Sequence, residues 1–308
     1  MKRYSVRPAT LADIEAVCSL IAKQNIADYG EALTTTNDLT KSWQTMDLEH
    51  ATCLAYAEGK LMGYGELRDG DSPFIYLAAP SHMDLGFQLL TILEEKALRQ
   101  KMEKIEFFTR ISENNQTLLK IFASYGYKTN LSFLIMELDL EATPDIPQWP
   151  TGICVRCFVP GQDEQVTYLA DEEVSEDRGY HQPLDFEAWS RRMRLKSEQF
   201  DPGLWFLACE ARSAEIAGLA LNLYRPQSST GWVDHLGVRR AWRKKGIGKA
   251  LLLHSLGEFY RRDVRHIKLT VDSKSLTNAP RLYESVGMKP VQQYHIYTKS
   301  VVQDHGLA

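Results

Sequence analysis

The chain has 308 residues and a formal net charge of -4 at pH 7, and 44% of its residues are hydrophobic and 25% are charged. At roughly 100–200 residues per domain, this length predicts two domains, each long enough to bury its own core. The mean hydropathy of -0.32 and the lack of an apolar run near roughly 18 residues argue against a membrane span or a membrane partner. The acidic total argues against a nucleic-acid partner.

The first residues lead directly into alternating and then helical patterns, without the apolar stretch of a secretory signal. Five cysteines are an odd number, which argues against a disulfide framework and favours a reducing compartment. Cys154 and Cys157 match C-x-x-C but no second pair follows, so we interpret them as packing residues. We therefore expect a cytoplasmic protein without a metal.

Strand and helix patterns alternate along the first half. A strand, a turn and a helix are predicted within 4–22, and 53–68 predicts a hairpin that turns at 58–60. The remaining predicted elements are a strand (74–79), a helix from Asp84, a strand (104–110), a second helix and a closing strand (132–140).

The segment 139–152 contains three prolines and little apolar content, which predicts a linker. The same order then returns as a strand (153–158), a helix (186–193), a hairpin (204–224), a strand (231–238), a helix from Gly246, a strand (266–272), a helix (279–286) and a strand (294–300). Both halves follow the order β-α-β-β-β-α-β-α-β. We therefore predict a duplication of a mixed sheet flanked by helices, in the α/β (α+β) class.

The second half concentrates positive charge around one loop. Residues 1–150 carry 14 Lys and Arg against 21 Asp and Glu, whereas residues 151–308 carry 22 against 19. A glycine-bearing turn at the start of a helix presents free N–H groups and the positive end of the helix dipole, which favours a phosphate. The cations beside this turn are Arg239, Arg240, Arg243, Lys244, Lys245 and Lys249.

Two familiar phosphate motifs do not match this loop. A Walker loop needs a glycine five residues before Gly248 and a Ser or Thr after Lys249, where Arg243 and Ala250 stand. A dinucleotide-binding fingerprint needs a third glycine at Leu251. The sequence therefore argues against a nucleoside triphosphate and against NAD.

The loop resembles the acyl-CoA loop of the GCN5-related N-acetyltransferase (GNAT) superfamily. The signature R/Q-x-x-G-x-G/A appears as "RKKGIG" in 243–248, and the preceding strand ends in "LGV", 236–238. The stretch 275–288 resembles the second signature of the family, a helix with A-x-x-L-Y-x-x-x-G-F/M. Ala279, Leu282, Tyr283, Gly287 and Met288 occupy its positions.

The resemblance extends to the first half in element order, so it implies two tandem GNAT domains, each a mixed and mostly antiparallel sheet flanked by helices. The corresponding loop, 79–90, is about two residues shorter than the usual spacing in the family, measured from Pro80 to the leucine pair, and it lacks an arginine and contains only Gly86. No tyrosine stands at the expected acid position, near Leu119 or Lys120. We therefore predict a degenerate domain (1–142), a Pro-rich linker (143–150) and a catalytic, acetyl-CoA-binding domain (151–308).

The resemblance implies roles for the residues that match the family motifs. Main-chain groups of the strand end bind pantetheine and the thioester oxygen, and loop amides and cations bind the CoA phosphates. The implied acetyl-CoA-binding residues are Leu236, Gly237, Val238, Arg243, Lys244, Lys245, Gly246, Ile247, Gly248, Lys249, Ala250, Asn278 and Tyr283. Tyr283 is also the candidate general acid for the departing thiolate.

An alkyl ammonium has a pKa near ~10.4, so the acceptor amine needs a base. Asp234 is the predicted base because it shares a strand face with Trp232 and Leu236, next to the reacting carbonyl. His235 points the other way and is interpreted as a packed histidine, although a one-residue bulge would reverse the assignment. A structural hydrogen-bonding role for Asp234 also stays open.

The acceptor pocket is predicted in the segment 171–189. Its seven acidic residues fit a cationic amine or a solvated loop: Asp171, Glu172, Glu173, Glu176, Asp177, Asp185 and Glu187. The leading hypothesis is an N-acetyltransferase that acts on a small-molecule amine by direct attack in a ternary complex, as a monomer or weak dimer. A non-catalytic acyl-CoA-binding regulatory module and a protein N-terminal or lysine acetyltransferase remain alternatives.

In a tandem enzyme of this family with a similar layout, a glutamate stands four residues before the equivalent of "LGV". Trp232 stands there in this chain. The acceptor of that enzyme is therefore not carried over.

Overall fold

The protein is described from a computed structural model, in which residues 4–100, 104–178, 181–197, 200–275 and 279–302 are described. The chain divides into two compact units. Unit 1 comprises residues 1–132 and 292–308, and unit 2 comprises residues 133–291. No helix within the described ranges is both long and apolar enough to cross a membrane.

Unit 1 contains a four-stranded antiparallel sheet in the order β1-β2-β3-β4. Helix α4 packs on β3 and β4 of this sheet, and α1 also contacts both strands. The elements of the first half are β1 (Ser5–Arg7), α1 (Ile14–Tyr29), α2 (Thr36–Thr45), α3 (Leu48–Ala51), β2 (Thr52–Ala57), β3 (Lys60–Arg68), β4 (Ser72–Leu77), α4 (Met83–Gln100), β5 (Lys104–Ser112), α5 (Gln116–Ser124) and β6 (Lys128–Asp139).

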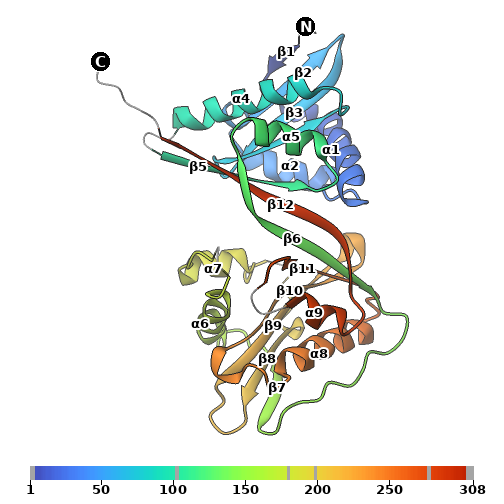
Figure 1. Ribbon diagram of the computed structural model, residues 1–308, viewed down its shortest axis with the longest axis vertical. Coiled ribbons are helices and arrows are strands. Elements are labelled where there is room, and N and C mark those ends of the chain that lie inside the picture. The colour runs from blue at the N-terminus through green and yellow to red at the C-terminus, as the bar shows by residue number, and fades with distance from the viewer. Residues whose placement is uncertain (1–3, 101–103, 179–180, 198–199, 276–278, 303–308) are drawn as a thin grey trace. The chain divides into compact units, whose positions relative to one another are not determined.

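Unit 2 contains strands in the order β6-β11-β10-β9-β8-β7, antiparallel except for the parallel pair β10 and β11. Helix α8 covers one face of this sheet, and α6 and α7 lie over the other (Figure 1). The elements of the second half are β7 (Ile153–Cys157), α6 (Glu164–Ser175), α7 (Phe186–Arg192), β8 (Trp205–Glu210), β9 (Ile216–Arg225), β10 (Thr230–Val238), α8 (Ile247–Arg261), β11 (His266–Asp272), α9 (Ala279–Glu284) and β12 (Lys289–Val302).

The closing strands of the two halves are exchanged. β6 comes from the first half, yet its residues from Phe133 to Asp139 pair with β11, and its Met136 lies in the core of unit 2. β12 comes from the second half, yet it pairs with β5, and Lys299 on it binds Glu94 of α4 at 2.7 Å. Each unit therefore contains a strand from the other half of the sequence.

Because of this exchange, the boundaries of the compact units differ from the predicted domain boundaries at residues 142 and 151. The predicted boundaries follow the order of elements along the chain, whereas the units break inside β6 and β12. The hydrogen bonds between β6 and β11 assign part of β6 to unit 2, and those between β12 and β5 assign most of β12 to unit 1. That the two sequence halves are copies of one domain stays a prediction.

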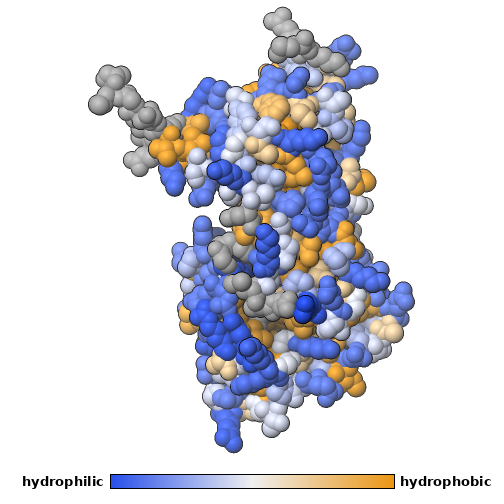
Figure 2. Space-filling model, in the orientation of Figure 1, coloured by the Kyte–Doolittle hydropathy of each residue, from blue (hydrophilic) through white to orange (hydrophobic). Residues whose placement is uncertain are grey.

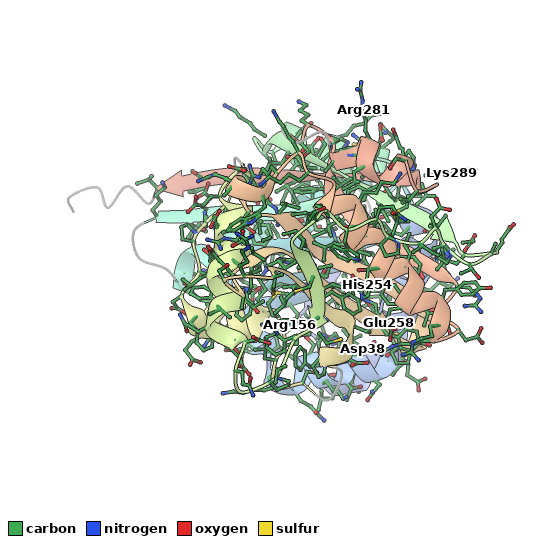
Figure 3. The ribbon with its side chains drawn as sticks, turned by 90° about the horizontal axis from the view of Figure 1, so that it is seen from below. Asp38, Arg156, His254, Glu258, Arg281 and Lys289 are labelled. Carbon is green, nitrogen blue, oxygen red and sulfur yellow. The ribbon has the colours of Figure 1, made fainter. Side chains whose placement is uncertain are left out.

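The Pro-rich segment packs on unit 2. Leu140 N donates to Arg265 O at 2.8 Å, and Leu140 is buried. The centre of the Trp149 ring lies 6.0 Å from the centre of the His254 ring. His254 lies on α8, near Glu258 of the same helix (Figure 3). Several residues of the predicted linker are thus fixed to the surface of unit 2.

A matching ion pair follows the first strand of each half. Arg7 donates to both carboxylate oxygens of Asp13 at 2.8 and 2.6 Å, and Arg156 does the same to Asp163 at 2.5 and 2.8 Å. These bonds hold the pKa of Asp13 and of Asp163 below the ordinary value. Both pairs tie the first strand to the start of the following helix.

Cys154 and Cys157 are exposed, so their interpretation as packing residues is wrong. They lie on β7, which is the edge strand of its sheet, and an edge strand has a neighbour on one side only. Cys53 and Cys209 are the cysteines buried among the described residues.

Candidate functional site

Strands β10 and β11 separate partway along their length. Their parallel pairing runs from Thr230 with His266 to Val233 with Leu269 and ends there. β10 continues to Val238 along β9, and β11 continues to Asp272 along β6. The second part of β10 therefore has an edge that is not paired with β11, and we call the opening between the two strands the splay.

Leu236 and Val238 have main-chain groups on the edge that faces the splay. Arg239 N donates to Ala217 O, which marks a hydrogen-bonded pair, and such pairs alternate along an antiparallel ladder. Gly237 therefore bonds to β9, whereas the N–H and C=O groups of Leu236 and Val238 point to the splay. Of the three residues predicted to bind pantetheine, Leu236 can offer both main-chain groups there and Val238 its N–H group, since the carbonyl of Val238 accepts from Arg243 Nε.

Gly237 has a different reason to be glycine. A Cβ atom at this position would lie 2.7 Å from Cγ1 of Val174 on α6. Real Cβ atoms do not approach so closely, so glycine lets α6 pack directly against β10. This contact brings the acidic end of α6 to the strand that lines the splay.

The glycine-bearing turn leads into the N-terminus of α8. Gly246 has a φ of 86° and Lys244 a φ of 60°, both in the left-handed region, and Gly246 caps the helix. The first helical hydrogen bond of α8 runs from Ala250 N to Gly246 O. The N–H groups of the residues before Ala250 in this first turn have no helical acceptor, as at any helix N-terminus. A Cβ atom at Gly248 would have its nearest neighbours at 3.6 Å, so the first turn is sterically open.

The arginines of the loop are paired within the chain. Arg239 binds Glu173 at 2.6 Å, Arg240 binds Asp177 at 2.8 Å, and Arg243 binds both Asp177 and the carbonyl of Val238. Figure 2 shows hydrophilic residues gathered where α6 lies. These carboxylates were predicted to face an acceptor amine or solvent, and that expectation is wrong for Glu173 and Asp177, because the end of α6 packs beside the loop.

The three lysines of the loop remain exposed, and among the described residues they form no ion pair. Lys245 Nζ donates only to Ala241 O, at 3.3 Å. Lys244, Lys245 and Lys249 therefore supply the cations available to a bound anion, together with the N-terminal amides of α8. An open first turn, a left-handed cap and free lysines fit a pyrophosphate.

Tyr283 lies on α9, next to Leu282, whose Cδ2 would lie 3.6 Å from a Cβ atom at Gly248. Its side chain is buried, and burial raises its pKa to about 12, with the charge of Arg178 acting in the opposite direction. The phenol is therefore protonated at neutral pH and can donate a proton. Asn278, the other residue predicted in this region, lies outside the described residues.

A bulge in β10 changes which side chains face α6. Val233 pairs with Asn222 and His235 pairs with the next residue of β9, Leu221, so Asp234 is the extra residue. Val233 and Leu236 both pack in the core beneath α8, and His235 turns to α6, where it is buried. The expectation that Asp234 shares a face with Trp232 and Leu236 is wrong, and its side chain is exposed.

The chain is similar to known proteins along its whole length. It is 30% identical over 293 residues to a protein of Streptomyces scabiei named mycothiol acetyltransferase, which covers 93% of this chain and 92% of that one. The family model described as the acetyltransferase (GNAT) family matches residues 166–288. The chain belongs to the GNAT family.

Solved structures agree with this assignment. A GCN5-related N-acetyltransferase from Sphaerobacter thermophilus has a TM-score of 0.84 and 32% identity, covering 100% of this chain and 98% of that one. A tandem GNAT protein from the clavulanic acid biosynthesis pathway has a TM-score of 0.73 at 15% identity, with 97% and 98% covered. This second likeness shows the fold alone.

The first half of this GNAT chain has a phenylalanine at the counterpart of Tyr283. Tyr127 N donates to Phe122 O at 3.0 Å, and Met288 N donates to Tyr283 O at 3.2 Å, each just after a left-handed glycine. Phe122, rather than Leu119 or Lys120, therefore occupies the equivalent position. It has no hydroxyl group to donate.

The first GNAT half also lacks an open turn. A Cβ atom at Gly86 would lie 2.3 Å from Cδ1 of Ile121, so the side chain from α5 already fills the space above the first turn of α4. Gly86 corresponds to Gly248, because Leu77 lies beside Gly86 as Val238 lies beside Gly248. Gly248 is ten positions after Val238, whereas Gly86 is nine positions after Leu77. The loop of the first half is therefore one residue shorter than that of the second half.

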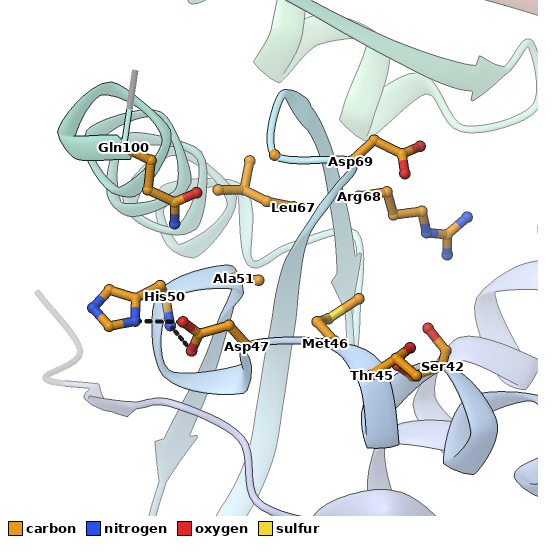
Figure 4. A pocket seen from close by; sticks show the side chains of 11 residues that line it. Ser42, Thr45, Met46, Asp47, His50, Ala51, Leu67, Arg68, Asp69 and Gln100 are labelled. Atoms are coloured by element: carbon orange, nitrogen blue, oxygen red, sulfur yellow. Dashed lines mark hydrogen bonds and ion pairs between the residues drawn. The ribbon is translucent and has the colours of Figure 1, made fainter. Parts of the chain in front are cut away.

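Unit 1 has a hollow elsewhere, with a volume of about 720 Å³. It is lined by residues of α2, α3, the end of β3 and the end of α4, and Asp47 binds the main chain and ring of His50 within it (Figure 4). None of the predicted site residues lies there. Within the described ranges, no cluster of His, Cys, Asp and Glu could hold a metal ion.

Proposed function

We propose that the chain transfers an acetyl group from acetyl-CoA to the amine of a small molecule, by direct attack in a ternary complex. The observation that carries the proposal is the splay of β10 from β11, followed along the chain by the glycine-capped N-terminus of α8. Membership of the GNAT family and the acetyltransferase names of its relatives support the same reaction.

Acetyl-CoA supplies the acetyl thioester in this proposal. The main-chain groups of Leu236 and the N–H group of Val238 hold the pantetheine arm, because the carbonyl of Val238 already accepts from Arg243. The first-turn amides of α8 hold the pyrophosphate. The predicted contacts from Arg243 to Ala250 come from main-chain N–H groups and lysine side chains, because the arginine side chains are already paired. Tyr283 donates a proton to the departing sulfur.

The acceptor is proposed only as a small amine. The relatives named mycothiol acetyltransferase suggest an acceptor related to mycothiol as one candidate, but Trp232 stands at the position of a glutamate that the comparable tandem enzyme possesses. The guanidinium of Arg225 stacks on the Trp232 ring, with its carbon 4.3 Å from the ring centre. This stacked pair lines the strand with a different chemistry from a carboxylate.

The proposal is tested with the full-length chain. Isothermal titration with acetyl-CoA measures binding, and a thiol-release assay over polyamines, aminoglycosides, amino acids and amino sugars measures transfer. We expect saturable binding with one site per chain and amine-dependent thiol release for at least one class. Binding without release for any amine indicates the non-catalytic module, release only with peptides indicates a protein acetyltransferase, and no binding contradicts the proposal.

A further inference from the structure

Three buried side chains from three elements form a hydrogen-bonded chain beside the splay. Trp189 Nε1 of α7 donates to Asp171 Oδ2 of α6 at 2.9 Å, and Asp171 Oδ1 lies 2.8 Å from His235 Nδ1 of β10. Their exposed fractions are 1%, 2% and 9%. Both oxygens of the carboxylate are thus engaged, and His235 is the most exposed of the three.

This arrangement fixes the protonation of the imidazole ring. Burial by itself raises the pKa of Asp171, but the charge of His235 and the hydrogen bonds from His235 and Trp189 outweigh it, so its pKa lies below the ordinary value. An ionised carboxylate can only accept hydrogen bonds, so Nδ1 of His235 carries the hydrogen in the neutral ring. The lone pair is then on Nε2, which has no hydrogen-bond partner among the described residues.

The position of His235 in the strand connects this group to the site. The bulge turns it to the α6 face immediately before Leu236, the first residue whose main chain points to the splay. Asp171 from α6 contacts the ring of His235, and Asp234 precedes His235 on its own strand. The charge of Arg178, beyond the end of α6, acts on both Asp171 and Tyr283. Asp234, by contrast, is exposed and makes no hydrogen bond among the described residues.

We infer that His235 is the general base of the transfer reaction and that Asp171 and Trp189 are positioning residues for it. This inference rests on the proposed function. Nε2 takes a proton from the acceptor ammonium, the freed nitrogen lone pair forms the N–C bond, and the C–S bond breaks with its electron pair on sulfur. Sulfur takes the proton of Tyr283. One of the two protons on nitrogen passes through solvent to Tyr283, the other stays on the amide, and His235 releases its proton, giving amide, thiol and one proton.

Three variants of the full-length chain separate the candidates. H235Q removes the base, and D234N tests the base predicted from sequence. In D171N the amide oxygen accepts from Trp189 Nε1, so the NH2 group faces Nδ1 of His235 and reverses the tautomer. With any amine that supports thiol release, we expect H235Q and D171N to lower kcat/KM by roughly 10²–10⁴-fold. We expect D234N to stay within about threefold, and titration with acetyl-CoA to give the wild-type Kd for all three.

The pH profile distinguishes a base from a structural residue. Protonated imidazole cannot accept a proton, so kcat/KM of the wild type falls as the pH falls, and this acidic limb disappears in H235Q and D171N. An unchanged limb and rate in H235Q, or a loss confined to D234N, overturns the inference. A chain without thiol release for any amine instead contradicts the proposed function.

The tautomer is measurable without an acceptor. Long-range ¹H–¹⁵N spectra of the histidine rings should place the hydrogen of His235 on Nδ1 in the wild type and on Nε2 in D171N. Hydrogen on Nε2 in the wild type overturns the inference whatever the acceptor is.

Discussion

At the scale of single residues, one bulge decides which side chain of β10 faces α6. Asp234 and His235 are neighbours in sequence, and strict alternation along a strand would turn Asp234 to the acceptor side. The extra residue at Asp234 reverses this alternation, buries His235 against Asp171 and leaves the aspartate exposed. A similar single-residue difference separates the two halves, where Phe122 stands in place of Tyr283.

Tyr283→Phe tests the proposed general acid. We expect kcat to fall by roughly 10²–10⁴-fold because the departing sulfur loses its proton donor. The Kd for acetyl-CoA and the melting temperature should change little, because the variant keeps the buried ring. Since burial raises the pKa of Tyr283 to about 12, the wild-type rate should show no loss from its ionisation up to about pH 10.

Tyr260→Phe is the matched control. This tyrosine lies on α8 with the guanidinium of Arg265 3.9 Å from its ring centre and is assigned no role in the reaction. It should keep the wild-type kcat. Full activity in Tyr283→Phe would show that the proton comes from another group.

At the scale of elements, the anion site depends on how a helix begins. α8 starts after a left-handed glycine and its first turn has room beside Gly248, whereas the first turn of α4 is filled by Ile121 and carries the negative charge of Asp84. A carboxylate at a helix N-terminus repels an anion and satisfies the helix dipole itself. The same element in the two halves therefore differs in its fitness for a phosphate.

Gly248→Val tests the open turn of α8. The Cβ atom has ordinary contacts at 3.6 Å, so we expect the melting temperature to change by only a few degrees. The added methyl groups block the close approach of an anion to the helix amides, so the Kd for acetyl-CoA should rise at least about tenfold. Titration calorimetry and thermal unfolding measure the two effects.

Gly257→Val provides the same substitution on the same helix, where a Cβ atom would have no neighbour within 4 Å. It should leave the Kd unchanged. Equal Kd values for the two variants would contradict the placement of the anion at the start of α8.

At the scale of the whole molecule, the exchanged strands make each unit dependent on both halves of the sequence. Seven residue pairs join β6 to β11 and nine join β12 to β5. Separate expression of residues 1–142 and 151–308 would remove one of these strands from each unit. The competence of the second half for acetyl-CoA is therefore better tested in the intact chain.

Cleavage in the linker tests the exchange. We replace residues 142–147 with a protease recognition sequence, which leaves Trp149 against His254. After cleavage the two fragments should co-elute in native size-exclusion chromatography and separate only in denaturant, because the strand pairs join them. Two independent native peaks would contradict the exchange, and the uncleaved variant controls for the insertion.

The sequence by itself indicated the order of most strands and helices, which depends on local periodicity, and the GNAT family, which depends on motifs within short segments. The roles of the acyl-CoA loop and of Tyr283 stay proposals. It missed α2, α3 and α6, whose apolar spacing is short or interrupted by charges. The tertiary structure alone decided the pairing of the loop arginines with α6, the bulge at Asp234 and the exchange of β6 and β12. These features depend on contacts between residues far apart in sequence or on an extra residue in a strand pair. Such contacts and bulges leave no periodic signal along the chain.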